Sequence, residues 1–391
     1  MSASASSAAL HTDLPSEPQT REAKRYHKLK LIGSIVALVL SMAYLAIVAL
    51  WLGPKLGRMV QIWTNNEWLR LIVFAFVYAA GAELLTLPLD FWSGFILEHR
   101  FGLSNQTLLR WIWREVKGYL VGGPLGLVMV VGLYALLWFT RPWWLWAALA
   151  WLAMTLVLGR IVPILILPLF YKVAPLDDAS LRERLERIAA GTGLSIEGIY
   201  RLHLSAETKK ANAALAGLGR SRRVLLGDTL LDGFTPEEIE VVFAHEVGHH
   251  VHRHLMKFVA LSVVLAGVGL WLVDVVLRHA AVRLGYESFA DPAALPLVLL
   301  VLGLFGLVLM PLQNAISRYF EGQCDRYALE RTGNHQAYRS AFLKLANLNK
   351  ADMEPHPLVV WLFHDHPPIE ERVILADAGL VSGFPPTGDQ R

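Results

Sequence analysis

The sequence has little charge and almost no cysteine. Lys, Arg, Asp and Glu make up 18% of the 391 residues, whereas a soluble domain carries roughly 25%. This deficit excludes an ordinary soluble protein. The single cysteine, Cys324, cannot form an internal disulfide, which is compatible with a cytoplasmic location. The formal net charge of +3 is too small to suggest a nucleic acid as partner.

Apolar residues, in contrast, make up 54% of the chain. They form six runs, each long enough at about 20 residues to cross the hydrocarbon core of a bilayer. The number and length of these runs argue against the buried helices of a large soluble core. We therefore predict a mostly α-helical protein that crosses the lipid bilayer about six times. The runs lie near 31–53, 71–92, 118–139, 145–170, 258–277 and 293–316.

The charge around the first apolar run indicates its orientation. Residues 1–30 are polar and then basic, and we expect them to be a disordered cytoplasmic tail. The run that follows is too long for a cleaved signal peptide, so it is expected to remain as an anchor. Counting spans then places 171–257 and the C-terminus in the cytoplasm. The short loops are typical of a bacterial protein, so we expect the inner membrane, or the endoplasmic reticulum if the chain is eukaryotic.

The predicted spans divide the chain into six parts. The largest water-soluble part is an α/β insert between the fourth and fifth spans, with a helix over 177–193 and strands at 199–206 and 222–231. The parts are a tail at 1–30, four spans in 31–170, the insert at 171–257, two spans in 258–316, a cytoplasmic helical region at 317–380 and a disordered tail at 381–391.

The end of the insert predicts a well-capped helix. Thr235 is a good N-cap, Pro236 suits the first helical position, and Glu238 completes a capping box. We therefore expect a helix to begin near 236 and to include the histidines of HEVGHHVHRH, residues 245–254.

Part of this helix has the spacing of a metal site. His245 and His249 are four residues apart, so they lie on one face of a helix and can share one ion. Glu246 lies beside them, where a carboxylate can take a proton from water. Gly248 leaves room for close approach to this site. The stretch HEVGH matches the H-E-x-x-H pattern of zinc proteases.

The other three histidines need a separate interpretation. On a continuous helix, His250 and His254 face away from the metal-binding face, and we expect both to be polar residues at the membrane surface. His252 is an alternative third ligand because it lies one turn beyond His249. Three ligands in line on one helix would, however, strain a tetrahedral site.

A third ligand is sought after the sixth span, because catalytic zinc sites commonly use two histidines and a glutamate. Glu321 and Asp325 are four residues apart on an expected helix that leaves the membrane on the same side as His245. We predict that Glu321 binds the metal and that Asp325 orients a ligand histidine. The alternative is a pair of solvated acids beside Arg318 and Arg326.

Three segments in this order, HEVGH, SRYFEGQCDRYAL and HPPIEER, resemble the integral-membrane zinc endopeptidases of the type I CAAX prenyl protease kind. The similarity extends to EHRFGLSNQT, PLFYKVAPL and NAALAGLGRSRRVLLGDTLL, so it covers most of the chain from about 70 to 375. It implies a zincin-like catalytic insert, one zinc ion per chain, and peptide or protein substrates that are membrane-associated, prenylated or targets of membrane protein quality control.

The resemblance also implies roles for single residues. His245, His249 and Glu321 would be zinc ligands and Glu246 the catalytic base. Asp325 would be a catalytic acid close to the site, assigned in some members as the proton donor, and His366 would stabilise the oxyanion. A substrate-binding role is implied for three further residues, namely Asn212, Ala213 and Arg372.

Two alternatives come from other classes of protein. HEVGHH also fits one histidine box of a membrane di-iron oxygenase such as a desaturase, although no second such box is present. A non-catalytic membrane scaffold is the other. Within the spans, Glu83, Asp90 and Arg160 are costly unless they pair or face water, so we expect a water-filled cavity or an ion pair there.

Overall fold

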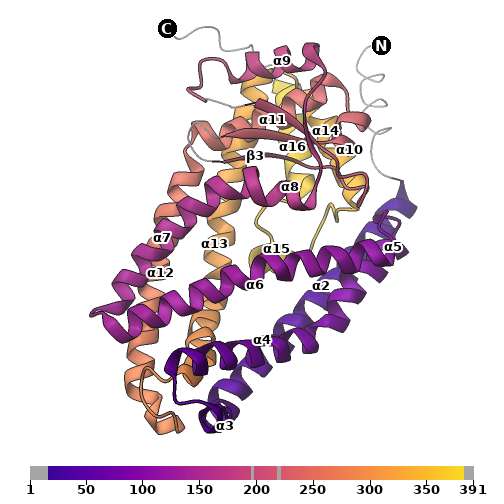
Figure 1. Ribbon diagram of the computed structural model, residues 1–391. Helices are drawn as coiled ribbons and strands as arrows, with labels where there is room; N and C mark the ends of the chain where they lie inside the picture. The colour runs from indigo at the N-terminus through magenta and orange to yellow at the C-terminus, as the bar shows by residue number, and fades with distance from the viewer. Residues whose placement is uncertain (1–15, 195–197, 218–221, 383–391) are drawn as a thin grey trace, which may run out of the picture.

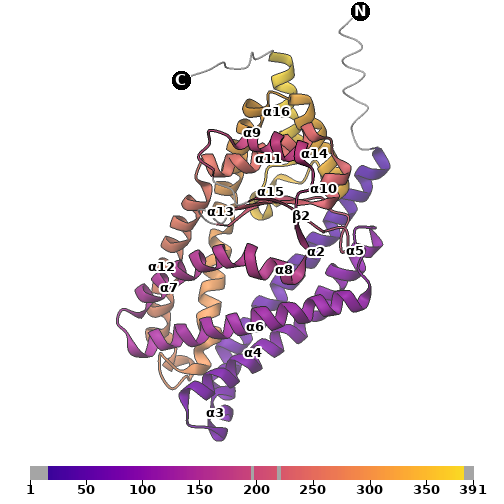
Figure 2. The ribbon, with the colours of Figure 1, turned by 45° about the horizontal axis from the view of Figure 1, so that its top comes forward.

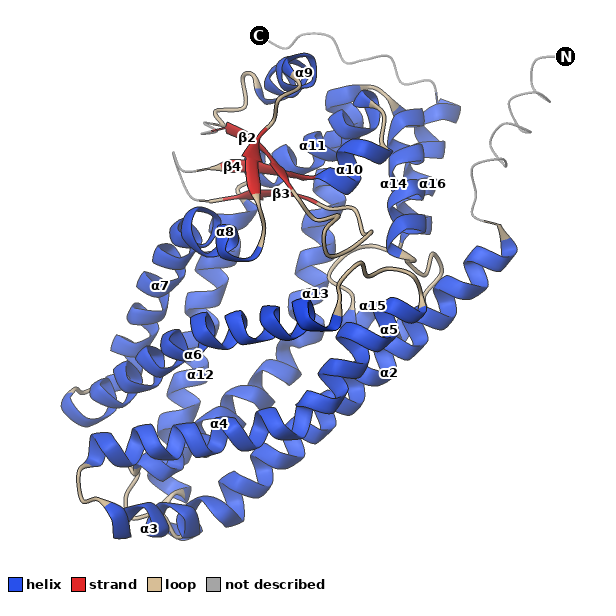
Figure 3. Ribbon diagram, turned by 45° about the vertical axis from the view of Figure 1, so that its right-hand side comes forward, coloured by secondary structure: helices blue, strands red, loops and turns tan. Residues whose placement is uncertain are grey.

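The structure, a computed structural model, describes residues 16–194, 198–217 and 222–382. Long helices form most of the molecule, and four short strands gather with shorter helices at one end (Figures 1 and 3). The predicted fold class, a mostly α-helical polytopic membrane protein with a small α/β insert, is confirmed.

Six helical segments in the described part of the chain are long and apolar enough to cross a membrane, and each contains one of the predicted ranges. Only 6% to 39% of the most apolar window of each is buried inside the protein. Most of each window is therefore not buried inside the protein, as expected of helices whose apolar side chains lipid can cover. The segments are Glu17–Trp63, Glu67–Arg100, Leu108–Phe139, Trp143–Phe170, His254–Ala280 and Pro292–Thr332.

Three of the first four segments contain a five-residue π-helical turn, at 48–52, 92–96 and 162–166. Their α-helices are α2 (Glu17–Ile47), α3 (Gly53–Trp63), α4 (Glu67–Phe91), α5 (Leu97–Arg100), α6 (Leu108–Phe139), α7 (Trp143–Ile161) and α8 (Leu167–Phe170). The last two segments are formed by α12 (His254–Ala280) and α13 (Leu295–Thr332), which pack against each other (Figure 2).

The first helix begins earlier than the sequence analysis predicted. Residues 1–30 were expected to be disordered, but α2 starts at Glu17, after a capping box at Ser16. The hydroxyl group of Tyr26 donates a 2.6 Å hydrogen bond to Glu98, and the ring is 3% exposed. Because only one face of this polar segment is buried, its composition resembled a tail. Residues before 16 lie outside the described part of the chain.

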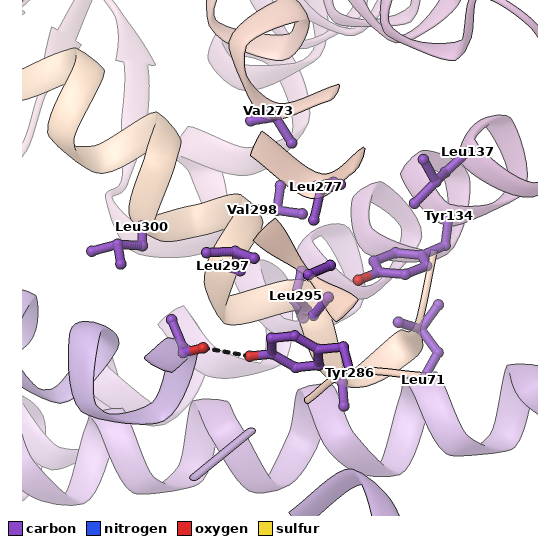
Figure 4. Close-up of a cluster of buried hydrophobic side chains, with 14 of the residues drawn as sticks. Leu71, Tyr134, Leu137, Val273, Leu277, Tyr286, Leu295, Leu297, Val298 and Leu300 are labelled. Carbon is purple, nitrogen blue, oxygen red and sulfur yellow. Dashed lines mark hydrogen bonds between the residues drawn. The ribbon is translucent and has the colours of Figure 1, made fainter. Parts of the chain in front are cut away.

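The main apolar core of the membrane region lies where the helices meet the segment between α12 and α13 (Figure 4). Tyr286, from that connection, donates a 2.6 Å hydrogen bond to the carbonyl oxygen of Ala49. Tyr134 from α6 donates a 3.2 Å hydrogen bond to the carbonyl oxygen of Asp291. Both rings are almost fully buried, so each hydroxyl group needs the partner that it has.

The insert contains a four-stranded sheet in the order β1-β2-β4-β3. β2 (Gly198–Leu202) and β4 (Arg223–Gly227) are parallel. β2 begins one residue before the predicted strand at 199–206 and ends inside it, and β4 falls within the strand predicted at 222–231. β1 (Val173–Pro175) and β3 (Ala213–Ala216) were not predicted, and they pair antiparallel to β2 and β4. β3 is therefore an edge strand.

Helices surround this sheet, and further helices follow toward the C-terminus of the chain (Figure 3). The expected helix over 177–193 is present as α9, although it is shorter. The tail predicted at 381–391 begins inside α16, and residues 383–391 lie outside the described part of the chain. The helices are α9 (Ala179–Ala189), α10 (Asp228–Gly233), α11 (Pro236–Val251), α14 (His335–Asn349), α15 (Pro357–Phe363) and α16 (Ile369–Ser382).

The histidine-rich helix α11 begins as predicted. Thr235 Oγ1 accepts a 3.3 Å hydrogen bond from the backbone of Glu238, and the Glu238 side chain accepts a 2.8 Å bond from Thr235 N. α11 packs closely on α13 at Gly248, where an added Cβ would lie 3.0 Å from the Cα of Cys324. Since α13 continues without a break to Thr332, the predicted boundary at 316 falls inside one helix.

The chain does not continue as one helix through the histidines. α11 ends at Val251, and Arg253 adopts a left-handed conformation, with φ 56° and ψ 34°, before α12 begins at His254. This break turns the chain back toward α13. The expectation that His254 faces the membrane surface is therefore wrong, because it assumed a continuous helix.

In the described part of the chain, the three charged residues singled out within the spans do not pair with one another. Glu83 accepts a 3.0 Å hydrogen bond from the hydroxyl group of Tyr119. Among the described residues, no ion pair joins Asp90 and Arg160, so that half of the prediction is wrong. A water-filled cavity around these groups stays a prediction.

Candidate metal centre and active site

Two helices bring three predicted ligands together. His245 and His249 come from α11 and Glu321 from α13, and one ligand atom of each lies within 4.8 Å of the others. The Nε2 atom of His245 is 3.1 Å from Oε2 of Glu321, and that of His249 is 3.3 Å from Oε1. The four-residue spacing on α11 and the close contact at Gly248 position these atoms.

This arrangement fits a metal ion better than it fits hydrogen bonds. Glu321 is 4% exposed, and its buried Oε2 makes no hydrogen bond among the described residues. Although His245 is only 3.1 Å away, the two groups are not aligned to donate and accept. A buried carboxylate oxygen without a partner is costly. A cation between the three side chains would satisfy it, and two imidazoles with one carboxylate are a common set for zinc.

His245 is held from behind by a buried ion pair. Its Nδ1 lies 2.9 Å from Oδ1 of Asp325, which is 2% exposed. Burial alone would lower the pKa of His245, but the hydrogen bond to Asp325 and the nearby carboxylate of Glu321 raise it to about 9. The two carboxylates around this imidazole therefore favour a positive charge at this position, and a bound metal ion would supply one. The predicted orienting contact of Asp325 is present.

Arg372 is the other member of that ion pair. Its Nε donates a 2.9 Å hydrogen bond to Asp325, and its guanidinium lies 3.8 Å from the ring centroid of Phe342. Burial opposes a charged Arg372, but the charge of Asp325 outweighs it and raises the pKa. The side chain is 7% exposed and lies behind Asp325. A direct substrate contact, the role that the resemblance implied, does not fit this placement.

Glu246 lies between the metal site and the edge of the sheet. Its Oε2 accepts a 3.3 Å hydrogen bond from the backbone N–H of Leu215 in β3. Asn212 is exposed just before β3, and its carbonyl oxygen accepts a 2.9 Å bond from Gly227 N. Ala213 is the first residue of β3. The predicted substrate segment, Asn212 and Ala213, thus lies at the start of the strand that contacts Glu246.

A cavity of about 940 Å³ opens beside these groups. Glu246 and His249 line it from α11, Leu215 from β3, and Met256 and Phe258 from the first turns of α12. The cavity therefore joins the metal site to the start of a membrane helix, and its walls are both polar and apolar.

His366 approaches the site from the loop before α16. Its Nε2 is 3.5 Å from Oε1 of Glu321, and its Nδ1 is 2.8 Å from Oδ1 of Asp365. The hydrogen bond to Asp365 raises the pKa of His366. The side chain is 56% exposed, so it can reach a bound substrate beside the ligands.

Among the remaining histidines, His254 differs from its prediction, whereas the alternative of His252 as a third ligand is not supported. His250 contacts the guanidinium of Arg222 in the cavity wall. His252 stacks on His254 at 5.4 Å and does not join the group of His245, His249 and Glu321. His254 is 1% exposed and contacts His249. Sequence reasoning missed this contact because it depends on the helix break at Arg253, where no glycine or proline signals a break.

Two family patterns together match almost the whole chain. The pattern of Peptidase family M48 matches residues 175–378, which contain all the predicted ligands. The chain belongs to peptidase family M48. A second pattern, described as the CAAX prenyl protease N-terminal region with five membrane helices, matches residues 7–172. In the described residues of that stretch, four segments are long enough to cross a membrane.

Similar M48 proteins occur in bacteria and eukaryotes. The metalloprotease YhfN of Bacillus subtilis is 30% identical over 326 residues, covering 82% of this chain and 76% of that protein. CAAX prenyl protease 1 of Saccharomyces cerevisiae is 29% identical, covering 78% and 72%. The crystal structure of Ste24p from S. mikatae has a TM-score of 0.81 at 24% identity, covering 94% of this chain and 91% of that chain. The last likeness shows a shared fold.

Membership of M48 decides between the functions considered. The protein is a multi-pass membrane metalloprotease that hydrolyses peptide bonds of peptides or proteins. The predicted resemblance is confirmed, and neither a di-iron oxygenase nor a non-catalytic scaffold agrees with it.

Proposed function

We propose that this M48 protein is a zinc-dependent endopeptidase that cuts membrane-associated substrates at the cytoplasmic face of its membrane. The convergence of His245, His249 and Glu321 supports this proposal most directly. Its catalytic region consists of 171–257 and 317–380, because the ligands come from both parts. One zinc ion per chain would act as a Lewis acid that polarises the scissile carbonyl group.

The side chains around the ligands have separate roles. Glu246 takes a proton from the attacking water and passes it to the leaving amine. Asp325 holds Nδ1 of His245 at 2.9 Å and so fixes the orientation of that ligand. Protonated His366 donates from Nδ1 to Asp365 and from Nε2 to the oxyanion. The hydrogen bond to Asp365 favours this protonated form because it raises the pKa of His366.

An extended substrate can bind along β3. This strand pairs only with β4 in the described sheet, so its second edge can accept a peptide strand. Asn212 and Ala213 are at its start, and Leu215 is within 3.3 Å of Glu246. A peptide added here would therefore pass the catalytic base.

Two observations support a substrate that comes from the membrane. The cavity beside His249 is lined by Met256 and Phe258, at the start of the apolar helix α12. In addition, several relatives are named CAAX prenyl protease 1. The cytoplasmic location follows from the basic residues before the first span, because cytoplasmic segments carry more Lys and Arg. Prenylated proteins with a CAAX-type C-terminus are the proposed substrates.

The test uses the full chain purified in detergent. Wild type should contain one zinc per chain by elemental analysis. Glu246→Gln should keep the zinc and lose peptide cleavage, whereas His249→Ala should lose both. Glu237→Gln is the matched control on the same helix, because Glu237 pairs with Arg184 in the first turn, about two turns before the ligands. Zinc-free active protein, or full cleavage by Glu246→Gln, would contradict the proposal.

Substrate choice needs a second measurement. A farnesylated CAAX-type peptide should be cleaved faster than the same peptide without the lipid, with Glu246→Gln as the blank. Equal rates would remove the prenyl group from the proposal while leaving the zinc endopeptidase in place.

A further inference from the structure

A buried histidine outside the set of predicted ligands contacts one of them. His254 lies between α11 and α13 and is 1% exposed. Its Nδ1 is 3.1 Å from Nδ1 of His249, and its Nε2 is 2.9 Å from Oε1 of Gln323. The three side chains therefore form a continuous row from Gln323 to the metal site.

Only one arrangement of protons satisfies this row when His249 binds a metal. His249 faces Glu321 with Nε2, so the lone pair of that nitrogen points to the metal and Nδ1 carries the proton. Nδ1 of His254 must then accept a hydrogen bond from this N–H, which leaves the hydrogen of His254 on Nε2. That hydrogen is donated to the amide oxygen of Gln323, which can only accept.

The fold holds His254 in place on several sides. The left-handed conformation of Arg253 directs the first residue of α12 back toward α11. The ring stacks on Phe320, with centroids 4.2 Å apart and planes within 7°. Its Nδ1 also lies 3.5 Å from the sulfur of Cys324. A ring fixed in this way can orient its neighbour without a large loss of side-chain entropy.

We propose that His254 is a positioning residue that sets the tautomer and orientation of His249, with Gln323 fixing His254 in turn. The inference rests on the proposed zinc ligation. The two ligand histidines are then supported differently, since a carboxylate holds His245 and a neutral imidazole holds His249. Partners of this kind change metal affinity by roughly 10- to 100-fold when removed.

The test measures zinc affinity by competition with a fluorescent chelator, and so does not depend on cleavage. His254→Leu removes the acceptor and should weaken zinc binding by roughly 10- to 100-fold. His254→Asn places an amide oxygen near the position of Nδ1 and should restore affinity to within a few-fold of wild type. His252→Leu is the matched control, because His252 stacks on His254 but makes no hydrogen bond to the ligand.

The outcomes separate this inference from the proposed function. Unchanged affinity in folded His254→Leu, or an equal loss in His252→Leu, would overturn it, as would a His254→Asn protein as weak as His254→Leu. A second zinc that is lost in Cys324→Ala would also overturn it, because His249, His254 and Cys324 would then be a metal site of their own. Failure of wild type to bind zinc at all would instead contradict the proposed function.

Discussion

Replacing Gly248 by alanine should damage the metal centre through the backbone of a neighbouring helix. The new Cβ would lie 3.0 Å from the Cα of Cys324 and 3.3 Å from its sulfur. Because ordinary carbon contacts are about 3.5 Å or longer, α11 and α13 would have to separate by about 0.5 Å. Overpacking of this kind costs about 1–3 kcal/mol. The gain in helix propensity over glycine, about 1 kcal/mol, offsets part of that cost.

The separation matters more for zinc than for folding. Glu321 lies one turn before Cys324 on α13, so its carboxylate would move away from both ligand histidines on α11. We expect Gly248→Ala to lower zinc affinity by roughly tenfold, as changes around metal ligands commonly do. The assay is competition with a chelator, together with thermal unfolding of the metal-free protein.

Gly322→Ala is the control for this prediction. Gly322 lies on α13 next to Glu321, and the nearest atom to an added Cβ there is Nη1 of Arg326 at 3.9 Å. The methyl group therefore has space. This variant should bind zinc like wild type and be as stable or more so. Wild-type affinity and stability in Gly248→Ala would refute the claim that this glycine sets the spacing of the two helices.

Three further predictions concern the surroundings of the ligands. Arg372→Met should lower the thermal midpoint strongly and weaken zinc binding, because breaking a buried ion pair costs about 3–5 kcal/mol and leaves Asp325 without its partner; an unchanged midpoint would contradict this. Asp365→Asn should shift the alkaline limb of the pH profile of kcat/KM to lower pH. Asp365 raises the pKa of His366, so His366 is fully protonated below its ordinary pKa and loses its proton only as pH rises through the raised value. A limb that does not move would count against the role of His366. Removing zinc with a chelator should lower the thermal midpoint of wild type but not of His249→Ala, since free zinc at 100 times its Kd stabilises a folded protein by about 2.7 kcal/mol.

The sequence predicted those features that a local pattern can specify. Six apolar runs indicated six spans, and the spacing of His245 and His249 predicted a shared face of one helix. Thr235 and Glu238 marked the start of that helix correctly. Glu321 was predicted to be a ligand because it follows the last span on the same side of the membrane, and the structure brings it to both histidines.

The errors arose where tertiary contacts override local signals. Arg253 adopts a left-handed conformation that usually favours glycine, so the helix break had no sequence signal. β3 consists of small apolar residues over only four positions, too few for a clear alternation. The segment after Glu17 is polar on most sides, and its order depends on contacts with distant parts of the chain. Tyr26 bonds to Glu98, Lys24 pairs with Glu354, and Glu22 pairs with Lys350.

Both helices that carry ligands are joined directly to the membrane. α13 runs from the last span to Glu321 as one helix, and α11 is followed by α12 after a two-residue break. A change in the tilt of α12 against α13 would therefore alter the distance between His249 and Glu321. Tilting is one way in which a span longer than the hydrocarbon core adjusts to bilayer thickness. The lipid composition of the membrane can thus change the geometry of the metal centre through the tilt of these two helices. A soluble fragment of this protein would lack this effect.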